Sequence, residues 1–303
     1  MKVFITGGTG FIGRALVEHL VAAGHQITVM GRSATSSQEE NPRHLQGNPV
    51  YPGPWQEELC RHEAVINLAG ASIFCRWTPA NRRKIRDSRV LTTRNIVNAL
   101  RLPDCLVRVL LNGSAVGYYG NRGTEKLDEK SSLGSGFLAE ICQEWETEAC
   151  RAEELGMRVV RCRLGVVLGQ NGGALAKMAP MFRTGLGARL GNGHQWFPWI
   201  HQTDLVRIFS LLLDHQEISG TVNCVAPEEV TNRDLTRELA KILHRPLLLP
   251  PAPAFIIRLV QGEASALLLD SQRVAPRRLE DAGFAFNFPT LTSALSDLLS
   301  PGK

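Results

Sequence analysis

Short apolar runs and helically spaced apolar positions alternate along the first part of the chain. Residues 3–5 and 26–30 are runs rich in branched and aromatic side chains, which is typical of buried strands. Residues 11–23 between them place their apolar side chains on one face of a helix. The pattern therefore predicts a strand, a helix and a second strand at the start of the chain.

The same alternation continues through the first half of the sequence. Apolar runs and helical periods predict strands at residues 64–68, 107–112 and 157–164, and helices at residues 79–101 and 137–155. A third strand is expected near Val50, in a polar stretch that contains several prolines. Six strands that alternate with helices predict an α/β fold with a Rossmann-type, doubly wound parallel sheet.

The alternation loosens after the turn expected at residues 165–169. Helices are predicted at residues 174–184, 204–213 and 232–243, with a loop at 185–201, a strand at 221–225 and a final small α/β element that ends in a helix. We therefore expect two domains. Residues 1–170 form a nucleotide-binding domain to which 201–226 return, and residues 171–200 and 227–303 form a smaller C-terminal α/β substrate domain.

A glycine-rich turn joins the first strand to the first helix. Gly8, Gly10 and Gly13 have the Gly-x-Gly-x-x-Gly spacing of a dinucleotide-binding turn, and Gly7 precedes them. Such a turn directs free backbone N–H groups and the positive end of a helix toward a phosphate. The residues expected to hold the cofactor here are Gly7, Thr9, Gly10, Phe11, Ile12 and Gly13. The alternative is a glycine-rich turn of some other α/β protein.

The end of the second strand indicates which cofactor is bound. An acidic residue usually closes this strand in NAD-binding proteins and binds the ribose 2′-hydroxyl. Here the strand is followed by Gly31 and Arg32, without an acid. A guanidinium at this point would bind a 2′-phosphate, so we expect NADP(H). The alternative is a solvated loop arginine.

Further cofactor contacts are expected where the other strands end. Leu68, Ala69 and Gly70 leave the fourth strand, and Val167 follows the sixth. Arg89 lies on the apolar face of the helix at residues 79–101, where an unpaired charge is costly, so it either reaches solvent or meets an anion. We expect Arg89 to contact the cofactor, with Lys84 as a second candidate.

Composition and charge narrow the function classes. The chain has 303 residues with a net charge of +5, and this positive charge favours an anionic cofactor. The sequence lacks the clustered basic and aromatic residues of a nucleic-acid binder.

No apolar stretch approaches the length of a membrane span, and we expect no signal peptide. Seven scattered cysteines without a Cys-x-x-Cys pair indicate reduced thiols and a cytoplasmic protein. The histidines show no metal-ligand spacing. The expected partner is a small-molecule substrate, and the chain is expected to be a monomer or homodimer.

Several motifs occur in the order of a known family. They are Thr6 to Gly13, Asn67 to Gly70, Ser114 after the fifth strand, and Pro198-Trp199-Ile200-His201 followed by Asp204-Leu205. With these motifs the chain resembles the extended short-chain dehydrogenase/reductases, which are NAD-dependent epimerase/dehydratase-like proteins. It resembles more closely an atypical branch, the NADP-dependent "epimerase family" proteins with a distinctive C-terminal domain. The residues that indicate this branch are Ser88-Arg89, 117–120, 137–140, Trp145-Glu146 and 193–201. The resemblance covers essentially the whole chain.

The resemblance implies a catalytic Ser or Thr, a Tyr and a Lys. Ser114 matches the first of these, but the helix that should begin with Tyr-x-x-x-Lys reads Phe-Leu-Ala-Glu-Ile-Cys from residue 137. Without this pair a standard epimerase is not expected. Tyr118 and Tyr119 are the nearest substitutes as proton donors, and the alternative is that they pack as structural aromatic residues.

Other side chains on the substrate side have two interpretations each. His194 and His201 could donate protons or could order their loop. Gln195, Trp196 and Trp199 could line an apolar pocket over the nicotinamide or could belong to the core.

Taken together, these features predict an NADP(H)-dependent oxidoreductase that acts on a small carbonyl or alcohol, with Ser114, Tyr118 and Tyr119 as its catalytic candidates. A cofactor-binding sensor or regulatory protein that has lost catalysis is the alternative, because the Tyr–Lys pair is missing. A nucleotide-sugar epimerase comes third, since it would need the same pair.

Overall fold

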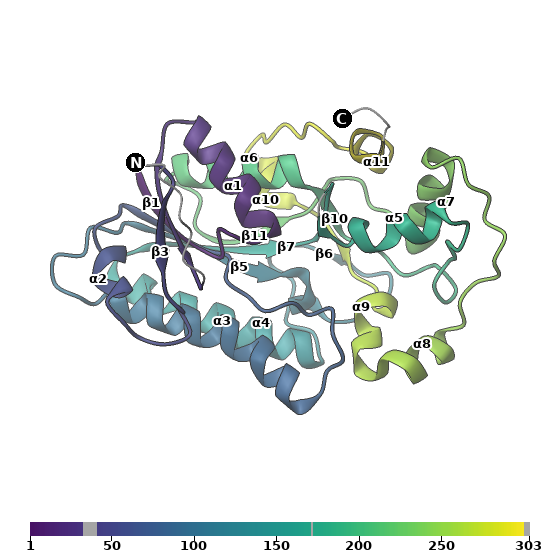
Figure 1. Ribbon diagram of the computed structural model, residues 1–303, viewed down its shortest axis with the longest axis horizontal. Coiled ribbons are helices and arrows are strands. Elements are labelled where there is room, and N and C mark those ends of the chain that lie inside the picture. The colour runs from purple at the N-terminus through teal and green to yellow at the C-terminus, as the bar shows by residue number, and fades with distance from the viewer. Residues whose placement is uncertain (33–40, 171, 300–303) are drawn as a thin grey trace.

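A seven-stranded parallel sheet forms the centre of the computed structural model, which describes residues 1–32, 41–170 and 172–299 (Figure 1). The strands lie in the order β3-β2-β1-β4-β5-β7-β11. Their bounds are β1 Lys2–Thr6, β2 Gln26–Gly31, β3 Arg43–Gln46, β4 Ala64–Asn67, β5 Val109–Ala115, β7 Arg158–Leu164 and β11 Gly220–Cys224. This order is that of a doubly wound Rossmann-type sheet, so the predicted fold class is confirmed.

Helices cover both faces of this sheet. Figure 1 shows α1 and α6 on one side and α2, α3 and α4 on the other. Their bounds are α1 Phe11–Ala22, α6 Gln202–Asp214, α2 Trp55–Leu59, α3 Pro79–Ala99 and α4 Phe137–Cys150. Because side chains alternate along a strand, Val3 and Ile5 pack under α1 and α6, whereas Phe4 belongs to the core on the opposite face.

Polar residues at the helix starts fix where these helices begin. Thr78 accepts a hydrogen bond from the Asn81 N–H at 3.3 Å, and Pro79 is the first residue of α3. His201 caps α6 by accepting a hydrogen bond from the Thr203 N–H at its Nδ1. Thr231 begins α7 in a reciprocal capping box.

The second half of the chain adds smaller elements beside the main sheet. A three-stranded sheet has the order β10-β8-β9, and β12 pairs with β6. The strands are β6 Lys126–Leu127, β8 Val166–Gly169, β9 Gly172–Gly173, β10 Trp199–His201 and β12 Arg273–Val274. The helices are α5 Leu175–Arg183, α7 Asn232–Ile242, α8 Ala254–Gln261, α9 Ala266–Leu269, α10 Arg277–Asp281 and α11 Leu291–Leu299. A separate apolar core joins β8, α5, α7 and α11.

Some elements differ from the sequence predictions. The third strand lies at Arg43–Gln46 rather than near Val50. The sequence pattern did not locate it, because this edge strand is only partly buried and lacks an apolar run. Residues 166–169 form β8 and not a turn, since they pair with Trp199–His201 in the segment expected to be a loop. The helix from Phe137 ends at Cys150, before a short 3-10 turn at Glu153–Leu155. The last fifty residues are mainly helical.

Elements in the segment 201–226, which is predicted to return to the nucleotide-binding domain, lie with the main sheet. Residues 202–214 form α6, which packs on α1, and residues 220–224 form the edge strand β11. The domain boundaries themselves stay a prediction. Among the described residues, no helix has the length and hydropathy needed to cross a membrane.

Candidate functional site

A cavity of about 600 Å³ opens at the carboxyl ends of the central strands. Its walls include the β1–α1 turn, the segments after β4 and β5, the end of β7, the start of α4 and parts of the C-terminal half. Eleven of the candidate residues line it: Gly7, Gly10, Phe11, Ile12, Gly13, Leu68, Ala69, Gly70, Arg89, Ser114 and Val167. Ligands bind at this edge in open parallel sheets.

The glycine turn has the tight geometry that a phosphate-binding turn requires. Gly7 has φ of 76°, and a Cβ there would lie 2.6 Å from the Leu68 carbonyl group. A Cβ on Gly13 would lie 2.2 Å from the Gly7 oxygen, so only glycine lets α1 start this close to β1. No side chain caps α1, and its hydrogen bonding begins at Arg14 N–H to Gly10 O. The first-turn amides at the cavity are therefore available to an anion.

Phe11 connects this turn to the second half of the chain. Its ring lies against Gly169, Gly172 and Gly173 at the β8–β9 hairpin. Its carbonyl oxygen accepts a hydrogen bond from Gln202 Nε2 at 2.9 Å. Phe11 thus lines the cavity and also fixes the turn against β8 and α6.

A buried amide network holds the segment that follows β4. Asn67 Oδ1 accepts a hydrogen bond from Thr6 Oγ1 at 2.6 Å, and Asn67 Nδ2 donates to Thr93 and Asn112. The Ala69 N–H donates to the same Oδ1 at 3.3 Å. The ends of β1, β4 and β5 are therefore tied together, and the backbone of residues 68–70 is held at the cavity wall.

Arg89 brings a partly buried positive charge to the cavity. Its Nη1 donates to the carbonyl oxygens of Ala71 and Ile85 at 3.1 and 3.0 Å, and its guanidinium lies against Gly70 and 5.4 Å from the Trp145 ring. Burial lowers the pKa of Arg89. Within the described residues no carboxylate forms an ion pair with it. A cofactor phosphate would supply the missing negative charge, so these residues fit a dinucleotide.

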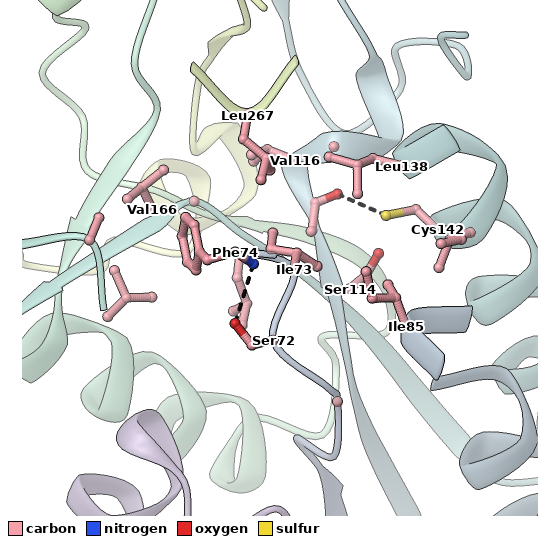
Figure 2. A pocket seen from close by; sticks show the side chains of 18 of the residues that line it. Ser72, Ile73, Phe74, Ile85, Ser114, Val116, Leu138, Cys142, Val166 and Leu267 are labelled. Carbon is pink, nitrogen blue, oxygen red and sulfur yellow. Dashed lines mark hydrogen bonds between the residues drawn. The ribbon is translucent and has the colours of Figure 1, made fainter. Parts of the chain in front are cut away.

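Ser114 sits at the end of β5, within the strand rather than after it, and its side chain is hydrogen-bonded to a buried acid. Its Oγ donates to Glu146 Oε1 at 2.6 Å, and Ser114 is 2% exposed. Both oxygens of Glu146 pair with Arg163, from Nε and Nη2 at 2.8 Å each. The hydroxyl of Ser114 is thus directed at a neutralised carboxylate. Figure 2 shows Ser114 at the cavity wall.

The two tyrosines after Ser114 point elsewhere, which corrects the expectation for them. The Tyr119 hydroxyl donates to Asn223 Oδ1 at 2.7 Å and accepts from Arg163 Nη1 at 2.9 Å. Burial raises the pKa of Tyr119 to about 12. The Tyr118 ring stacks under the Arg163 guanidinium at 3.4 Å. Neither tyrosine lines the cavity, so the alternative interpretation, structural packing, fits their placement.

Three of the expected cofactor residues lie outside the cavity lining. Lys84 is exposed on α3, and Thr9 is exposed on the glycine turn. Arg32 is exposed at the end of β2, and Gly31 beside it lies against the Thr9 methyl group. Arg32 and Thr9 therefore border the turn on its β2 side, whereas the exposed side chain of Lys84 does not line the described cavity.

The helix that should carry the Tyr–Lys pair presents other side chains. Leu138, Ile141, Cys142 and Trp145 of α4 line the cavity. Burial raises the pKa of the Cys142 thiol, which lies beside Ser114, to about 11 (Figure 2). In the described chain no tyrosine or lysine takes the expected place on this face of α4.

The remaining candidates lie in the cavity wall, in the protein core or on the surface. Gln195 and Trp196 line the cavity. Trp199 is buried and donates to the Glu228 carbonyl oxygen, and His201 is buried as the cap of α6, so both belong to the core. His194 is exposed. The loop-ordering interpretation therefore fits His201.

Sequence reasoning missed the roles of Asn67, Glu146 and Arg163. A signal for Arg163 exists, because a central strand of a doubly wound sheet is buried on both faces and an arginine there needs an anionic partner. The partner could not be chosen from the sequence, since several glutamates lie on the preceding helix.

Comparisons with known proteins match the chain along most of its length. The family described as the NAD dependent epimerase/dehydratase family matches residues 3–224, and a domain of unknown function (DUF1731) matches residues 252–298. The "Epimerase family protein SDR39U1 homolog, chloroplastic" of Arabidopsis thaliana is 38% identical, over 99% of this chain and 87% of that protein. The "Epimerase family protein Mb2239" of Mycobacterium bovis is 41% identical, over 97% of this chain and 96% of that protein.

A solved structure extends this similarity to the fold. The human epimerase family protein SDR39U1 (isoform 2), crystallised with NADPH, superposes with a TM-score of 0.86 at 33% identity. The similarity covers 98% of this chain and 99% of the human one.

Proposed function

The chain belongs to the NAD-dependent epimerase/dehydratase family, and from this premise we propose that it is an NADP(H)-dependent oxidoreductase acting on a carbonyl or alcohol. The observation that carries the proposal is that Ser114 shares one cavity with the glycine turn and with the unpaired charge of Arg89. The NADPH in the human relative's structure supports the choice of cofactor.

Each part of the cavity has a role in this function. The first-turn amides of α1 bind the diphosphate, and Arg89 neutralises negative charge on the cofactor. Arg32, at the end of β2, binds the 2′-phosphate that distinguishes NADP from NAD. The bound cofactor supplies or accepts the hydride.

Ser114 orients the reacting oxygen of the substrate. While the Ser114 hydroxyl donates to Glu146, its lone pairs accept a hydrogen bond from an alcohol substrate, whose proton leaves to solvent as the hydride is lost. Toward a carbonyl substrate the hydroxyl turns from Glu146 and donates to the carbonyl oxygen, and the proton that completes the alcohol comes from solvent. Arg163 keeps Glu146 charged and in place. Glu146 and Arg163 act through Ser114 and are positioning residues.

The test is to mix the purified protein and NADPH with a panel of aldehydes and ketones and to follow NADPH oxidation. We expect turnover that falls by roughly 100-fold or more in Ser114→Ala, because the reacting oxygen loses its orientation. NADPH affinity should stay within about twofold of the parent, since Ser114 holds the substrate rather than the phosphates. Leu259→Gln, on the exposed face of α8, is the control that should keep full turnover.

One observation favours a second function, a sensor or regulatory protein that binds NADPH without turnover. The face of α4 at the cavity carries Leu138 and Cys142 where a Tyr–Lys pair would supply the proton. Silence across the whole panel, together with tight NADPH binding, would favour the sensor and reject the enzyme.

A further inference from the structure

The part of the cavity away from the glycine turn is walled by apolar side chains from separate segments. They come from the loop after β4, the start of α4, the segment before β10, and α9. We call these residues the apolar wall: Ile73, Phe74, Trp77, Leu138, Phe197 and Leu267. Figure 2 shows Ile73, Phe74, Leu138 and Leu267 around the same space as Ser114.

Charged side chains are few at this end of the cavity. Among the described lining residues they are Arg89, Lys177 and Asp270. Arg89 lies against Gly70, on the cofactor side. Lys177 is exposed, and its Nζ lies 4.5 Å over the Phe74 ring. Asp270 is half-buried and would repel an anion when ionised. A second diphosphate, as in a nucleotide sugar, would meet no cluster of cations here.

The apolar wall is held in place and reaches the surface. Gln195 Nε2 donates to the carbonyl oxygens of Leu190 and Leu268, both at 3.1 Å, and so fixes α9 beside the 190–195 segment. Phe74 and Leu268 both line the cavity and are 45% and 38% exposed. An apolar molecule could thus pass from solvent to Ser114 along apolar side chains.

We propose that the substrate is an apolar alcohol or carbonyl compound without a phosphate or sugar, whose alkyl or aryl group packs on the apolar wall while its oxygen lies at Ser114. This inference rests on the proposed oxidoreductase function for its reaction, and on the wall for its substrate class. A pocket with this lining distinguishes substrates by the number of methylene groups they bury rather than by their hydrogen bonds.

The first measurement is turnover of a homologous series, the methyl ketones from 2-butanone to 2-octanone, with NADPH. We expect kcat/KM to rise roughly fourfold for each added methylene, the factor that corresponds to ~0.8 kcal/mol per buried methylene, until the wall is filled. UDP-glucose should give neither turnover nor competition. A flat or falling series, or better use of UDP-glucose, overturns the inference.

The second measurement separates this inference from the proposed function. Dissociation constants of the alcohols 2-butanol to 2-octanol are measured by calorimetry on the NADP⁺-loaded protein. A chain-length dependence without any turnover would keep the substrate class and reject the oxidoreductase. Turnover without chain-length dependence in either series would keep the oxidoreductase and reject the apolar substrate class.

Variants of the wall complete the test. Leu267→Gln and Ile73→Gln should each reduce the gain per methylene to about twofold or less and leave NADPH binding unchanged. Leu259→Gln is the matched control, because Leu259 is 82% exposed on α8 and does not line the cavity. If the wall variants and the control behave alike, the wall does not bind the substrate.

Discussion

Two arginines beside the cavity, one buried and one partly buried, differ in what surrounds their charge. Arg163 is paired through two hydrogen bonds with Glu146, and the pair is further satisfied by Ser114 and Tyr119. Arg89 has carbonyl oxygens as partners and no carboxylate in the described part of the chain. A partly buried charge without a counter-ion is costly, so we expect Arg89 to lower the stability of the cofactor-free protein and to be neutralised when an anion binds.

This difference predicts opposite effects for one substitution at the two positions. Arg89→Met should leave the unfolding free energy of the cofactor-free protein unchanged or higher, and should weaken NADPH binding by roughly 10- to 150-fold. Arg163→Met should lower the unfolding free energy by roughly 3–5 kcal/mol, because Glu146 is left buried without a partner. Urea unfolding and an NADPH fluorescence titration measure both quantities. Equal destabilisation by the two substitutions would contradict the role given to Arg89.

Cofactor choice is also decided by one side chain in our proposal. Arg32→Ala should weaken NADPH binding by roughly 1.5–3 kcal/mol, since a charge-assisted bond to the 2′-phosphate is lost. NADH, which lacks that phosphate, serves as the internal control and should bind as before. Equal losses for both cofactors would remove Arg32 from the site.

Single residues near Ser114 show why sequence reasoning reached only part of the site. The glycine turn and Arg89 were predictable, because their spacing and their conflict with an apolar face are local signals. The tyrosines were not, because the partner that turns Tyr119 away from the cavity is Asn223, 104 positions later in the chain. The same holds for Glu146, whose pairing with Ser114 joins residues 32 positions apart.

At the scale of elements, the β1–α1 turn depends on how closely its backbone segments approach. The Cβ of an alanine at position 13 would lie 2.2 Å from the Gly7 oxygen and 2.6 Å from Gly8 Cα, and neither backbone atom can move independently of β1. At position 10 the corresponding contact is 3.2 Å, with an ordinary negative φ. An added Cβ would therefore disturb the geometry of the turn more at position 13 than at position 10.

This contrast can be measured. Gly13→Ala should lower the unfolding free energy by roughly 1–3 kcal/mol, the usual effect of overpacking, and should abolish measurable NADPH binding because α1 is displaced. Gly10→Ala should cost less stability, because its contact can relax by a few tenths of an ångström. Urea unfolding and calorimetric titration with NADPH give the two values. A Gly13→Ala protein with parental affinity would show that the turn does not hold the phosphates.

The predicted elements were most accurate where burial is complete. β1, β2 and β4 are nearly continuous apolar runs, and their positions agree with the sequence pattern. β3 is a partly exposed edge strand, and β8 is a four-residue strand whose parallel partner, β10, lies more than thirty positions away. Neither leaves a local hydrophobic period, so pattern reasoning could not locate them.

At the scale of the whole molecule, one cavity collects residues from nearly the entire chain. Its lining begins at Gly7 and ends at Gln272, so a bound cofactor would contact segments that lie far apart in the sequence. Binding to the folded state alone stabilises it in proportion to the logarithm of ligand concentration.

NADPH should therefore raise the thermal midpoint. At a concentration of about 100 times the dissociation constant, the unfolding free energy should rise by ~2.7 kcal/mol, which corresponds to a shift of several degrees. NADH at the same concentration should give a smaller shift, and Arg89→Met should reduce the shift for NADPH. A thermal midpoint that does not respond to NADPH would contradict cofactor binding in the cavity. Differential scanning calorimetry provides the measurement.

The strand order has a consequence for synthesis of the protein. β11, at residues 220–224, is the outer neighbour of β7 and supplies Asn223 to the hydroxyl of Tyr119. A nascent chain can add this strand only after Cys224 has left the ribosome. Until then the β7 edge, with Arg161 and Arg163, has no neighbouring strand, and such open edges are sites of mispairing between chains. The groups that orient Ser114 are therefore completed late, when the sheet closes on its last strand.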